Sequence, residues 1–269
     1  MLQHFLFIIW DPSPDFFCVG TFCIKWYGIM WGLSLFAGFF VSRYVFRKLN
    51  KDEEKITIAI QYMFICALIG ARLAHVFLYS WEYYSHHLIE IFEVWKGGLA
   101  SHGGTIGAIF GLYLFCRRNK EFSFFWTVDH GVLAVFFLAS FIRFGNLMNS
   151  EIVGYPANVP WAFVFKQVDN IPRHPVVLYE CIAYLLYQFL MLFLFNKYRE
   201  SKPGLYLTVF FFVFAVRFVI EFFKVPDGEL FFGAISKTQL LNIPFIIAGF
   251  VMLYLVLKGK LRYPPVANG

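Results

Sequence analysis

One segment near the middle of the chain gathers the polar groups that an anion-binding site needs. It reads RFGNLMNSEIVGYP, and its chemistry-bearing residues are Arg143, Asn146, Asn149, Glu151 and the glycines 145 and 154. Arginine binds a phosphate through a planar fork of N–H donors, and does so better than lysine where water is partly excluded. The segment follows an uncharged run (130–142), so we expect its side chains at the end of a membrane-spanning helix.

Further ionisable residues interrupt apolar runs elsewhere. A charge at the centre of a membrane helix costs about 2.5–3.5 kcal/mol on insertion scales, so each such residue invites a functional explanation. Arg217 and Glu221 are four residues apart, and a structural ion pair on one helix face explains them equally well. Arg72 could equally extend its guanidinium to the membrane surface.

His102 can be interpreted as a structural residue or as a functional one. A lone histidine in an apolar helix is more often a hydrogen-bonded core residue than a catalytic one. Gly103 and Gly104 follow it directly, however, and the lack of side chains there lets a ligand or another backbone approach. The glycines at 103, 107 and 111 also form a stripe at helical spacing, which indicates close helix packing.

The composition predicts an all-α integral membrane protein. The chain is 59% hydrophobic and only 15% charged, against about 25% charged residues in soluble proteins. A net charge of +6 fits basic loops that set membrane orientation, so we expect a lipid bilayer and no nucleic acid as partner. No linker separates domains, and residues 1–269 are expected to form a single polytopic membrane domain.

About seven transmembrane helices fit the uncharged windows, each near the 17–25 residues that a bilayer requires. The predicted spans are 26–42, 56–81, 97–116, 122–142, 175–195, 204–223 and 238–257.

The distribution of lysine and arginine predicts the orientation. The loops 43–55, 117–121 and 196–203 and the C-terminal tail are richer in Lys and Arg than the loops of the opposite side. Basic loops stay in the cytoplasm, so the N-terminus is expected outside and the C-terminus inside. The longest outer loop is then 143–174, and residues 1–25 are expected to form an interfacial segment.

This orientation brings most of the costly residues to one depth, the outer half of the membrane. They are Tyr27, Arg72, His102, Arg143, Glu180, Arg217 and Glu221. Asp129, near the inner end of its span, is the main exception. An anionic phospholipid head group is the ligand that such an arginine cluster suggests. A transporter of anions or anionic phospholipids that uses the same arginines is the alternative, since intramembrane charges also mark ion pathways.

Several reaction classes lack their motifs. The chain has no HExxH, CxxC or GxSxG pattern, so we expect no metal site, no cofactor and no serine nucleophile. Of the five cysteines, only Cys18 and Cys23 lie close together outside a span, which allows at most one disulfide.

The polar segments together resemble the prolipoprotein diacylglyceryl transferase family. RFGNLMNSEIVGYP is similar to the family signature G-R-x-G-N-x-x-N-x-E-x-x-G, although Ile142 replaces the first glycine. Further similar segments stand in the family's order along almost the whole chain: Trp26-Tyr27-Gly28, Gly70-Ala71-Arg72-Leu73, Trp95 to Gly104, His174-Pro175 with Leu178-Tyr179-Glu180, and Arg217 to Phe223. Ser236-Lys237-Thr238-Gln239 departs from the family's Met-Gly-Gln form.

The resemblance implies a transferase of lipoprotein biosynthesis in the bacterial cytoplasmic (inner) membrane, with its active site facing the outer leaflet. The expected substrates are phosphatidylglycerol and the lipobox cysteine of a prolipoprotein signal peptide. The diacylglyceryl group would pass to the cysteine as a thioether, and glycerol phosphate would leave.

The resemblance and the chemistry together assign expected roles. His102 is expected to act as base or to orient the thiol, since imidazole titrates near neutrality. Arg143 and Arg217 are expected to bind the phosphate, with Glu221, and also Glu151, holding the guanidiniums. The remaining expected substrate-binding residues are Tyr27, Arg72, Asn146 and Asn149 for hydrogen bonds, and Gly103, Gly104 and Gly154 for space.

Overall fold

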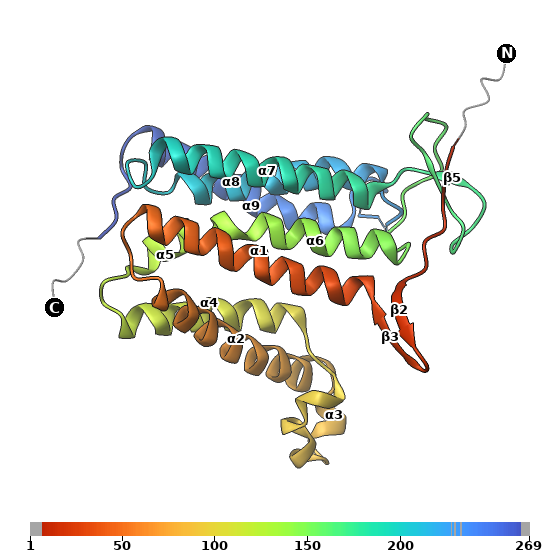
Figure 1. Ribbon diagram of the computed structural model, residues 1–269, viewed down its shortest axis with the longest axis horizontal. Coiled ribbons are helices and arrows are strands. Elements are labelled where there is room, and N and C mark those ends of the chain that lie inside the picture. The colour runs from red at the N-terminus through yellow and green to blue at the C-terminus, as the bar shows by residue number, and fades with distance from the viewer. Residues whose placement is uncertain (1–6, 227, 229, 232, 265–269) are drawn as a thin grey trace. The chain divides into compact units, whose positions relative to one another are not determined.

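The structure is a computed structural model that describes residues 7–226, 228, 230–231 and 233–264. Its α-helices are α1 (Trp26–Lys48), α2 (Glu54–Ala74), α3 (Trp81–Tyr84), α4 (Ser101–Arg118), α5 (Phe124–Gly131), α6 (Val135–Met148), α7 (Val176–Tyr198), α8 (Leu205–Ile220) and α9 (Lys237–Leu257). Short helical turns lie at η1 (His75–Tyr79), η2 (Leu88–Phe92), η3 (Val94–Lys96), η4 (Val132–Ala134) and η5 (Glu221–Phe223). The strands are β1 (Ile8–Trp10), β2 (Asp15–Val19), β3 (Phe22–Lys25), β4 (Phe163–Phe165) and β5 (Pro172–Arg173) (Figure 1).

Six helices within the described residues are long and apolar enough to cross a membrane, judged by length and composition: Trp26–Lys48, Glu54–Tyr79, Phe124–Met148, Val176–Tyr198, Leu205–Phe223 and Lys237–Leu257. They confirm the all-α membrane class and coincide with six of the seven predicted spans. The seventh, 97–116, corresponds to α4, whose hydropathy is lowered by Ser101, His102 and four glycines. Its crossing of the membrane, and the orientation of the chain, stay predictions.

One helix boundary differs from the sequence-based expectation. The span predicted to end at residue 142 continues to Met148, so Arg143 and Asn146 lie in the last turns of α6. The outer loop predicted at 143–174 therefore begins at Asn149. The sequence-based span was ended at the first polar residues. In the structure these residues remain part of the helix because their side chains pair with one another.

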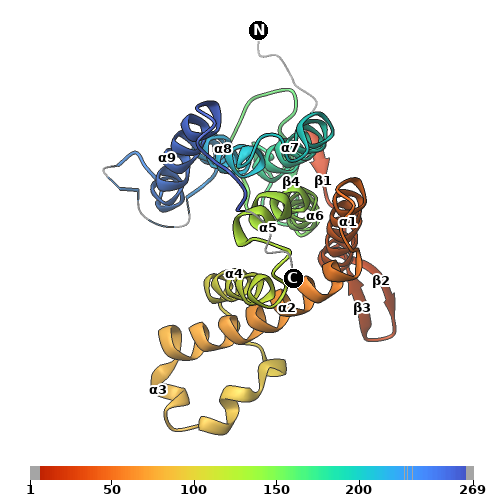
Figure 2. The ribbon, with the colours of Figure 1, turned by 90° about the vertical axis from the view of Figure 1, so that its left-hand side faces the viewer.

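The chain groups into two compact units, one of residues 1–42 and 129–262 and the other of residues 43–128 and 263–269. Each contains membrane-span helices, and the single membrane domain expected for residues 1–269 stays a prediction. In the first unit, α6 packs on α7, α7 on α8 and α8 on α9 (Figure 2).

The first unit carries a small three-stranded sheet at the α6–α7 connection. Its order is β1-β4-β5, with β1 parallel to β4 and β4 antiparallel to β5. Beside it, Leu147 and Val176 join Phe163 and Phe165 in a buried apolar cluster. The indole of Trp10 donates to the carbonyl of Leu147 at 3.0 Å. The sheet therefore holds the end of α6 against the start of α7.

The N-terminal segment forms a hairpin that leads directly into α1 (Figure 1). Strands β2 and β3 pair with Cys18 opposite Cys23, and a disulfide joins the two. This is the one pairing that the sequence allowed. The interfacial position expected for residues 1–25 stays a prediction, and residues 1–6 lie outside the described residues.

A buried glutamine bridges an interruption of the helical hydrogen bonds in the fourth predicted span. The turn η4 interrupts the α-helical hydrogen bonds between α5 and α6. Gln188 of α7 is completely buried; its amide accepts from the Phe137 N–H at 3.1 Å and donates to the Leu133 carbonyl at 2.8 Å. Those two backbone groups are four residues apart and would bond directly in a regular helix. Gln188 therefore bridges the break and locks α7 to it.

Asp129, the charge predicted to lie at the wrong depth for the site, has a structural role. Its fully buried carboxylate accepts from the N–H groups of Gly204 at 2.8 Å and Leu207 at 2.7 Å. Both groups belong to the beginning of α8, where helix N–H groups lack partners within the helix and an anion is favoured. Asp129 thus caps α8.

Asp129→Asn is therefore expected to lower stability while leaving most activity. Asparagine offers one acceptor oxygen for two N–H groups, and the loss of a helix cap costs about 1 kcal/mol. The thermal midpoint of the purified protein should fall, and the rate of thioether formation should stay within about threefold of wild type. An unchanged thermal midpoint would contradict the capping role, and a well-folded Asp129→Asn protein without activity would contradict the expectation that Asp129 lies away from the depth of the site.

Candidate active site

Two arginines of the first unit share one carboxylate. Nε of Arg143 lies 2.5 Å from Oε2 of Glu180, and Nε of Arg217 lies 3.9 Å from Oε1 of the same residue. The Glu180 side chain is only 10% exposed, so a single buried carboxylate lies between guanidiniums from α6 and α8. An anion bound here would contact both arginines at once.

The signature segment continues the network from Arg143. Asn146 accepts from Arg143 at 3.3 Å through Oδ1 and donates its amide to Glu151 at 2.7 Å. Asn149 donates to the other oxygen of Glu151 at 3.0 Å. The amide donors expected to bind the substrate are therefore engaged with Glu151, and Glu151 holds Arg143 only indirectly, through Asn146.

The turn that carries Glu151 is strained on both sides. Ser150 and Ile152 have φ values of 53° and 58°, in the left-handed region that non-glycine residues rarely adopt. The Glu151 N–H donates to the Asn146 carbonyl at 3.0 Å, which closes the turn onto α6. Strain of this kind persists where the surrounding structure imposes it, and it is concentrated at functional sites.

Gly145 brings the start of α1 to the same place. A Cβ added at Gly145 would lie 2.9 Å from the Tyr27 ring and 3.3 Å from its Cα. Tyr27 is half-buried and close enough to Arg143 to interact with it electrostatically. The first unit thus brings Tyr27 together with predicted site residues of the same network, which are Arg143, Asn146, Asn149, Glu151 and Arg217.

Gly154 fits between two other segments of backbone. Its N–H donates to the His174 carbonyl at 3.1 Å, and the next N–H, of Tyr155, donates to the Phe223 carbonyl at 2.9 Å. A Cβ at Gly154 would lie 2.5 Å from the His174 carbonyl and 2.7 Å from that of Phe223. The space expected at this glycine is therefore taken up by two other segments of the backbone.

His174, beside Gly154, is held in a neutral environment. Its Nδ1 lies 3.0 Å from the hydroxyl of Tyr179, which also accepts from the indole of Trp161 at 2.8 Å. Burial lowers the pKa of His174 below its ordinary value. We therefore expect the ring to be uncharged at pH 7.

The carboxylate expected to hold the arginines, Glu221, has different partners. It accepts from the Ser236 hydroxyl at 3.1 Å and lies 3.9 Å from the Lys224 ammonium. The Glu221 N–H still donates to the Arg217 carbonyl, so the backbone keeps the four-residue helical spacing, and the difference lies in the partners of the side chain. The carboxylate that pairs with Arg217 is Glu180, which corrects the sequence-based assignment.

The segment from Ser236 to Gln239, which departs from the family form, accounts for the partners of Glu221. Ser236 and Gln239 form a reciprocal capping box at the start of α9. The Gln239 amide also donates to the Phe218 carbonyl at 3.2 Å. Glu221 is therefore part of the contact that ties the end of α8 to the beginning of α9.

Arg72, in the second unit, directs its guanidinium at main-chain carbonyls. It donates to Glu90, Ile91, Gly97 and Gly98 at 2.5, 2.8, 2.7 and 3.2 Å, respectively. The two glycines have φ values of 89° and 70°, a conformation that glycine adopts at little cost. With four of its five N–H donors engaged, Arg72 organises residues 90–98, and the structure supports a positioning role over the expected substrate contact.

Arg72→Lys is expected to loosen this segment although the charge is retained. A lysine is a point donor and cannot reach the same four carbonyls through a planar fork. Loss of the guanidinium would leave partly buried carbonyls without these donors. Hydrogen exchange of residues 90–98 should accelerate, with residues 205–220 of the other unit as internal reference. Unchanged protection in that segment would argue against the positioning role.

Residues 102–104 of α4 differ in how far they are enclosed by the neighbouring helix α2. His102 is exposed, whereas Gly103 is buried against the Gly70 carbonyl and the Ala74 side chain of α2. Of the two uses expected beside Gly103, a ligand or another backbone, the structure shows the second, the backbone of α2. Gly104 is less enclosed, since an added Cβ would lie at an ordinary 3.5 Å from Ala71.

The remaining glycines of the stripe confirm its predicted packing role. A Cβ at Gly107 or Gly111 would overlap the backbone of α2 at Cys66 or Tyr62. The two helices lie side by side along this stripe (Figure 2). The convergence of His102 and Arg72 on one site with the residues of the first unit stays a prediction.

Sequence reasoning singled out Glu180 as a costly residue without giving it a role in the site, and it missed Tyr184 and Gln188. Glu180, Tyr184 and Gln188 are buried at successive four-residue steps on α7, which is the spacing of one helix face. Tyr184 interacts with both Arg143 and Glu180. Polar residues at this spacing in an otherwise apolar helix are the signal that could have identified them.

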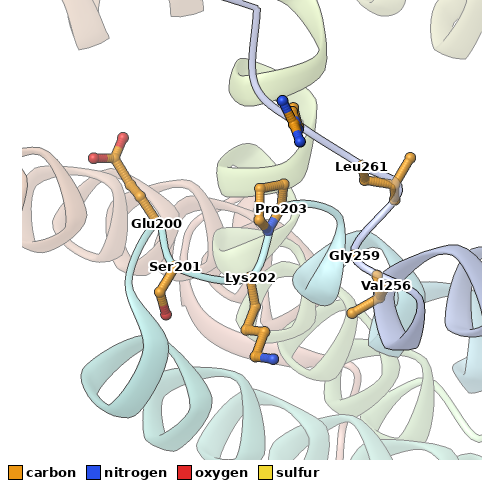
Figure 3. Close-up of a pocket in the computed structure, with 8 residues that line it drawn as sticks. Glu200, Ser201, Lys202, Pro203, Val256, Gly259 and Leu261 are labelled. Atoms are coloured by element: carbon orange, nitrogen blue, oxygen red, sulfur yellow. The ribbon is translucent and has the colours of Figure 1, made fainter.

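Two other features are poor candidates for the site. A hollow of about 300 Å³ lies between the α7–α8 loop and residues 256–262, near Lys202 and Arg262, at the opposite end of α7 from Glu180 (Figure 3). None of the predicted site residues lines it. Asp15 lies near Cys18 and Cys23, but those two sulfurs are bonded to each other and offer no thiolate to a metal.

The comparisons with known proteins agree with the resemblance. The family model for prolipoprotein diacylglyceryl transferase matches residues 14–255. A protein of Chloroherpeton thalassium named phosphatidylglycerol–prolipoprotein diacylglyceryl transferase is 42% identical over 257 residues, covering 94% of this chain and 95% of the relative. Proteins of the same name from Tolumonas auensis and Bacteroides fragilis are 38% identical over 260 residues and 39% over 275, covering 95% of this chain and 100% and 97% of the relatives. With its membrane helices, signature segment and relatives in agreement, this chain belongs to the prolipoprotein diacylglyceryl transferase family and is a transferase.

Proposed function

We propose that the protein transfers the diacylglyceryl group of phosphatidylglycerol to the lipobox cysteine of a prolipoprotein signal peptide. The reaction would take place at the outer leaflet of the bacterial cytoplasmic membrane. The names of the relatives support the substrates. The observation that carries the proposal is the arginine pair around Glu180, because it offers two guanidiniums to one phosphate at a membrane-helix end.

The proposed reaction is an alkylation of sulfur. The cysteine thiolate attacks the glyceryl methylene that carries the phosphate, a carbon–sulfur bond forms, and the carbon–oxygen bond breaks. The electron pair of that bond goes to the phosphate oxygen of the departing glycerol phosphate, and the thiol proton goes to a base. Two tasks follow: a thiol with an ordinary pKa of about 8.5 must be deprotonated, and the developing phosphate charge must be stabilised.

Arg143 and Arg217 are proposed to perform the second task. Nε of Arg217 is buried and has no hydrogen-bond partner among the described residues, so it can donate to an arriving phosphate oxygen. Asn146, Asn149 and Glu151 are proposed to hold Arg143 in place through their mutual hydrogen bonds. The hydroxyl of Tyr27 is proposed to donate a hydrogen bond to the head group.

His102 is proposed as the base or the group that orients the thiol. Support comes from its place in the segment WKGGLASHGG and from its exposed position at the start of α4. A side chain that transfers a proton by general acid–base catalysis typically accelerates a reaction about 10²–10⁴-fold.

His102→Ala is therefore expected to lower thioether formation about 10²–10⁴-fold. The protein should still insert and keep its thermal midpoint, since His102 fills no core position. Thr105→Ala, at an exposed position one turn further along α4, is the matched control and should stay active. Wild-type turnover by purified His102→Ala would remove the histidine from the mechanism.

One experiment tests the proposed function. Detergent-purified protein is incubated with labelled phosphatidylglycerol and a lipobox peptide, and the mass of the peptide is measured. A mass increase of one diacylglyceryl group on cysteine, with release of glycerol phosphate, is the expected result. Movement of intact phospholipid between leaflets of reconstituted vesicles, without peptide modification, would instead support a transporter.

A further inference from the structure

The charge around the arginine pair is set by Glu180. One oxygen faces Arg143 and the other faces Arg217, and the carboxylate is nine-tenths buried. Two guanidiniums and one carboxylate leave one net positive charge at this point. Tyr184, one helical turn along α7, contacts the same group without adding charge.

The proposed reaction changes the charge of the group that these arginines bind. The phosphodiester of phosphatidylglycerol carries one negative charge. When its carbon–oxygen bond breaks, the departing glycerol phosphate is a monoester with a second pKa of about 6, so it carries close to two charges at neutral pH. Two arginines without a counter-charge would hold this product more tightly than the substrate, and product release would become slow.

We propose that Glu180 is the residue that sets this charge selectivity: it weakens binding of the dianionic product more than binding of the monoanionic lipid. The inference rests on the proposed function, because it needs a phosphodiester substrate and a phosphomonoester product. Coulomb repulsion is proportional to the charge of the ligand, so Glu180 opposes the dianion about twice as strongly, in free energy, as the monoanion.

The test compares two affinities in Glu180→Gln, which keeps the shape and removes the charge. Glycerol 1-phosphate and a short-chain phosphatidylglycerol are titrated calorimetrically into the purified protein at pH 8. The change in binding free energy caused by Glu180→Gln should be about twice as large for the dianion as for the monoanion. The fold-increase in affinity for glycerol 1-phosphate should therefore be about the square of the fold-increase for the lipid, for example about tenfold against about threefold. At pH 5, where the monoester carries one charge, the two gains should become similar.

Two controls separate charge from geometry. Tyr184→Phe removes a neutral contact, so it should change both affinities by the same factor. Glu180→Asp retains the charge and should not favour the product. Equal gains, or losses, for the two ligands in Glu180→Gln would overturn the proposal and leave Glu180 a geometric support only. Glu180→Ala provides the same charge change if the glutamine variant does not fold.

The two hypotheses fail in different ways. If the wild-type protein forms no thioether on the lipobox peptide, the proposed function fails, whatever the affinities. If it forms the thioether but the affinity gains in Glu180→Gln are equal, only the charge selectivity fails.

Discussion

Arg143→Ala is expected to lower thioether formation about 10³-fold. Removal of one well-placed donor to a developing oxyanion costs about 10²–10³ in rate. Arg143 supplies charge as well as donors, so we expect the upper end of that range. The measurement is the initial rate of peptide modification by purified protein at saturating lipid.

The environment of Arg143 requires controls for structural damage. Its loss leaves the buried Glu180 carboxylate with Arg217 alone, at 3.9 Å. An unpaired buried charge is destabilising. The double variant Arg143→Ala/Glu180→Ala removes the orphaned carboxylate, so it should recover stability but not activity. Recovery of activity in the double variant would show that Arg143 only neutralises Glu180.

A matched control for Arg143 exists in the loop between α6 and α7. Lys166 is a cation whose ammonium bonds to the exposed Asn170 side chain. Lys166→Ala should retain near wild-type activity, since it lacks any contact with Glu180. Arg143→Lys should lie between wild type and alanine because lysine keeps the charge but cannot form the two-pronged contact.

Gly154→Ala is expected to abolish most activity through backbone displacement. The added methyl group would meet the His174 carbonyl and Cβ and the Phe223 carbonyl at 2.5–2.7 Å, and these are backbone or near-backbone atoms of two segments. The 151–156 segment must shift, and Glu151 with it. A displacement of about 1 Å at such a site costs about 10²-fold in rate.

The Gly154 prediction is checked by activity together with thermal stability. Gly32→Ala is the matched control, because nothing lies within 4 Å of a Cβ added at that helical position of α1. That variant should be active and as stable as wild type or more so, since alanine favours helix over glycine. A fully active Gly154→Ala protein would show that the close contacts at this glycine do not position the site.

The class of the protein and its site segments follow from the sequence alone. Six of the predicted spans coincide with apolar helices because span length and apolarity are local properties of the chain. The packing role of the stripe at Gly103, Gly107 and Gly111 was also readable, since helical spacing places these residues on one face. The family signature by itself identifies Arg143, Asn146 and Asn149 as candidate site residues.

The choice of partners was decided by the tertiary structure. Arg217 was expected to pair with Glu221, four residues away, yet it lies beside Glu180, 37 residues earlier in the chain. The Glu221 backbone stays in helical register with Arg217, but its carboxylate accepts from the Ser236 hydroxyl. Which of two acids reaches an arginine depends on where a helix ends and which face it turns to its neighbour, and residue spacing along one helix does not contain that information.

Arg72 and Asp129 illustrate the same limit. Both are buried charges that the sequence could identify as costly, but only the fold shows what compensates the cost. Arg72 is compensated by carbonyls of residues 90–98, and Asp129 by N–H groups at the start of α8. Local hydrophobicity and motif spacing therefore determined the membrane class, the family and the location of the signature. The pairing of its charges was decided by the packing of helices that are distant in sequence, because a buried charge is stabilised by whichever partner the fold brings within a few ångströms.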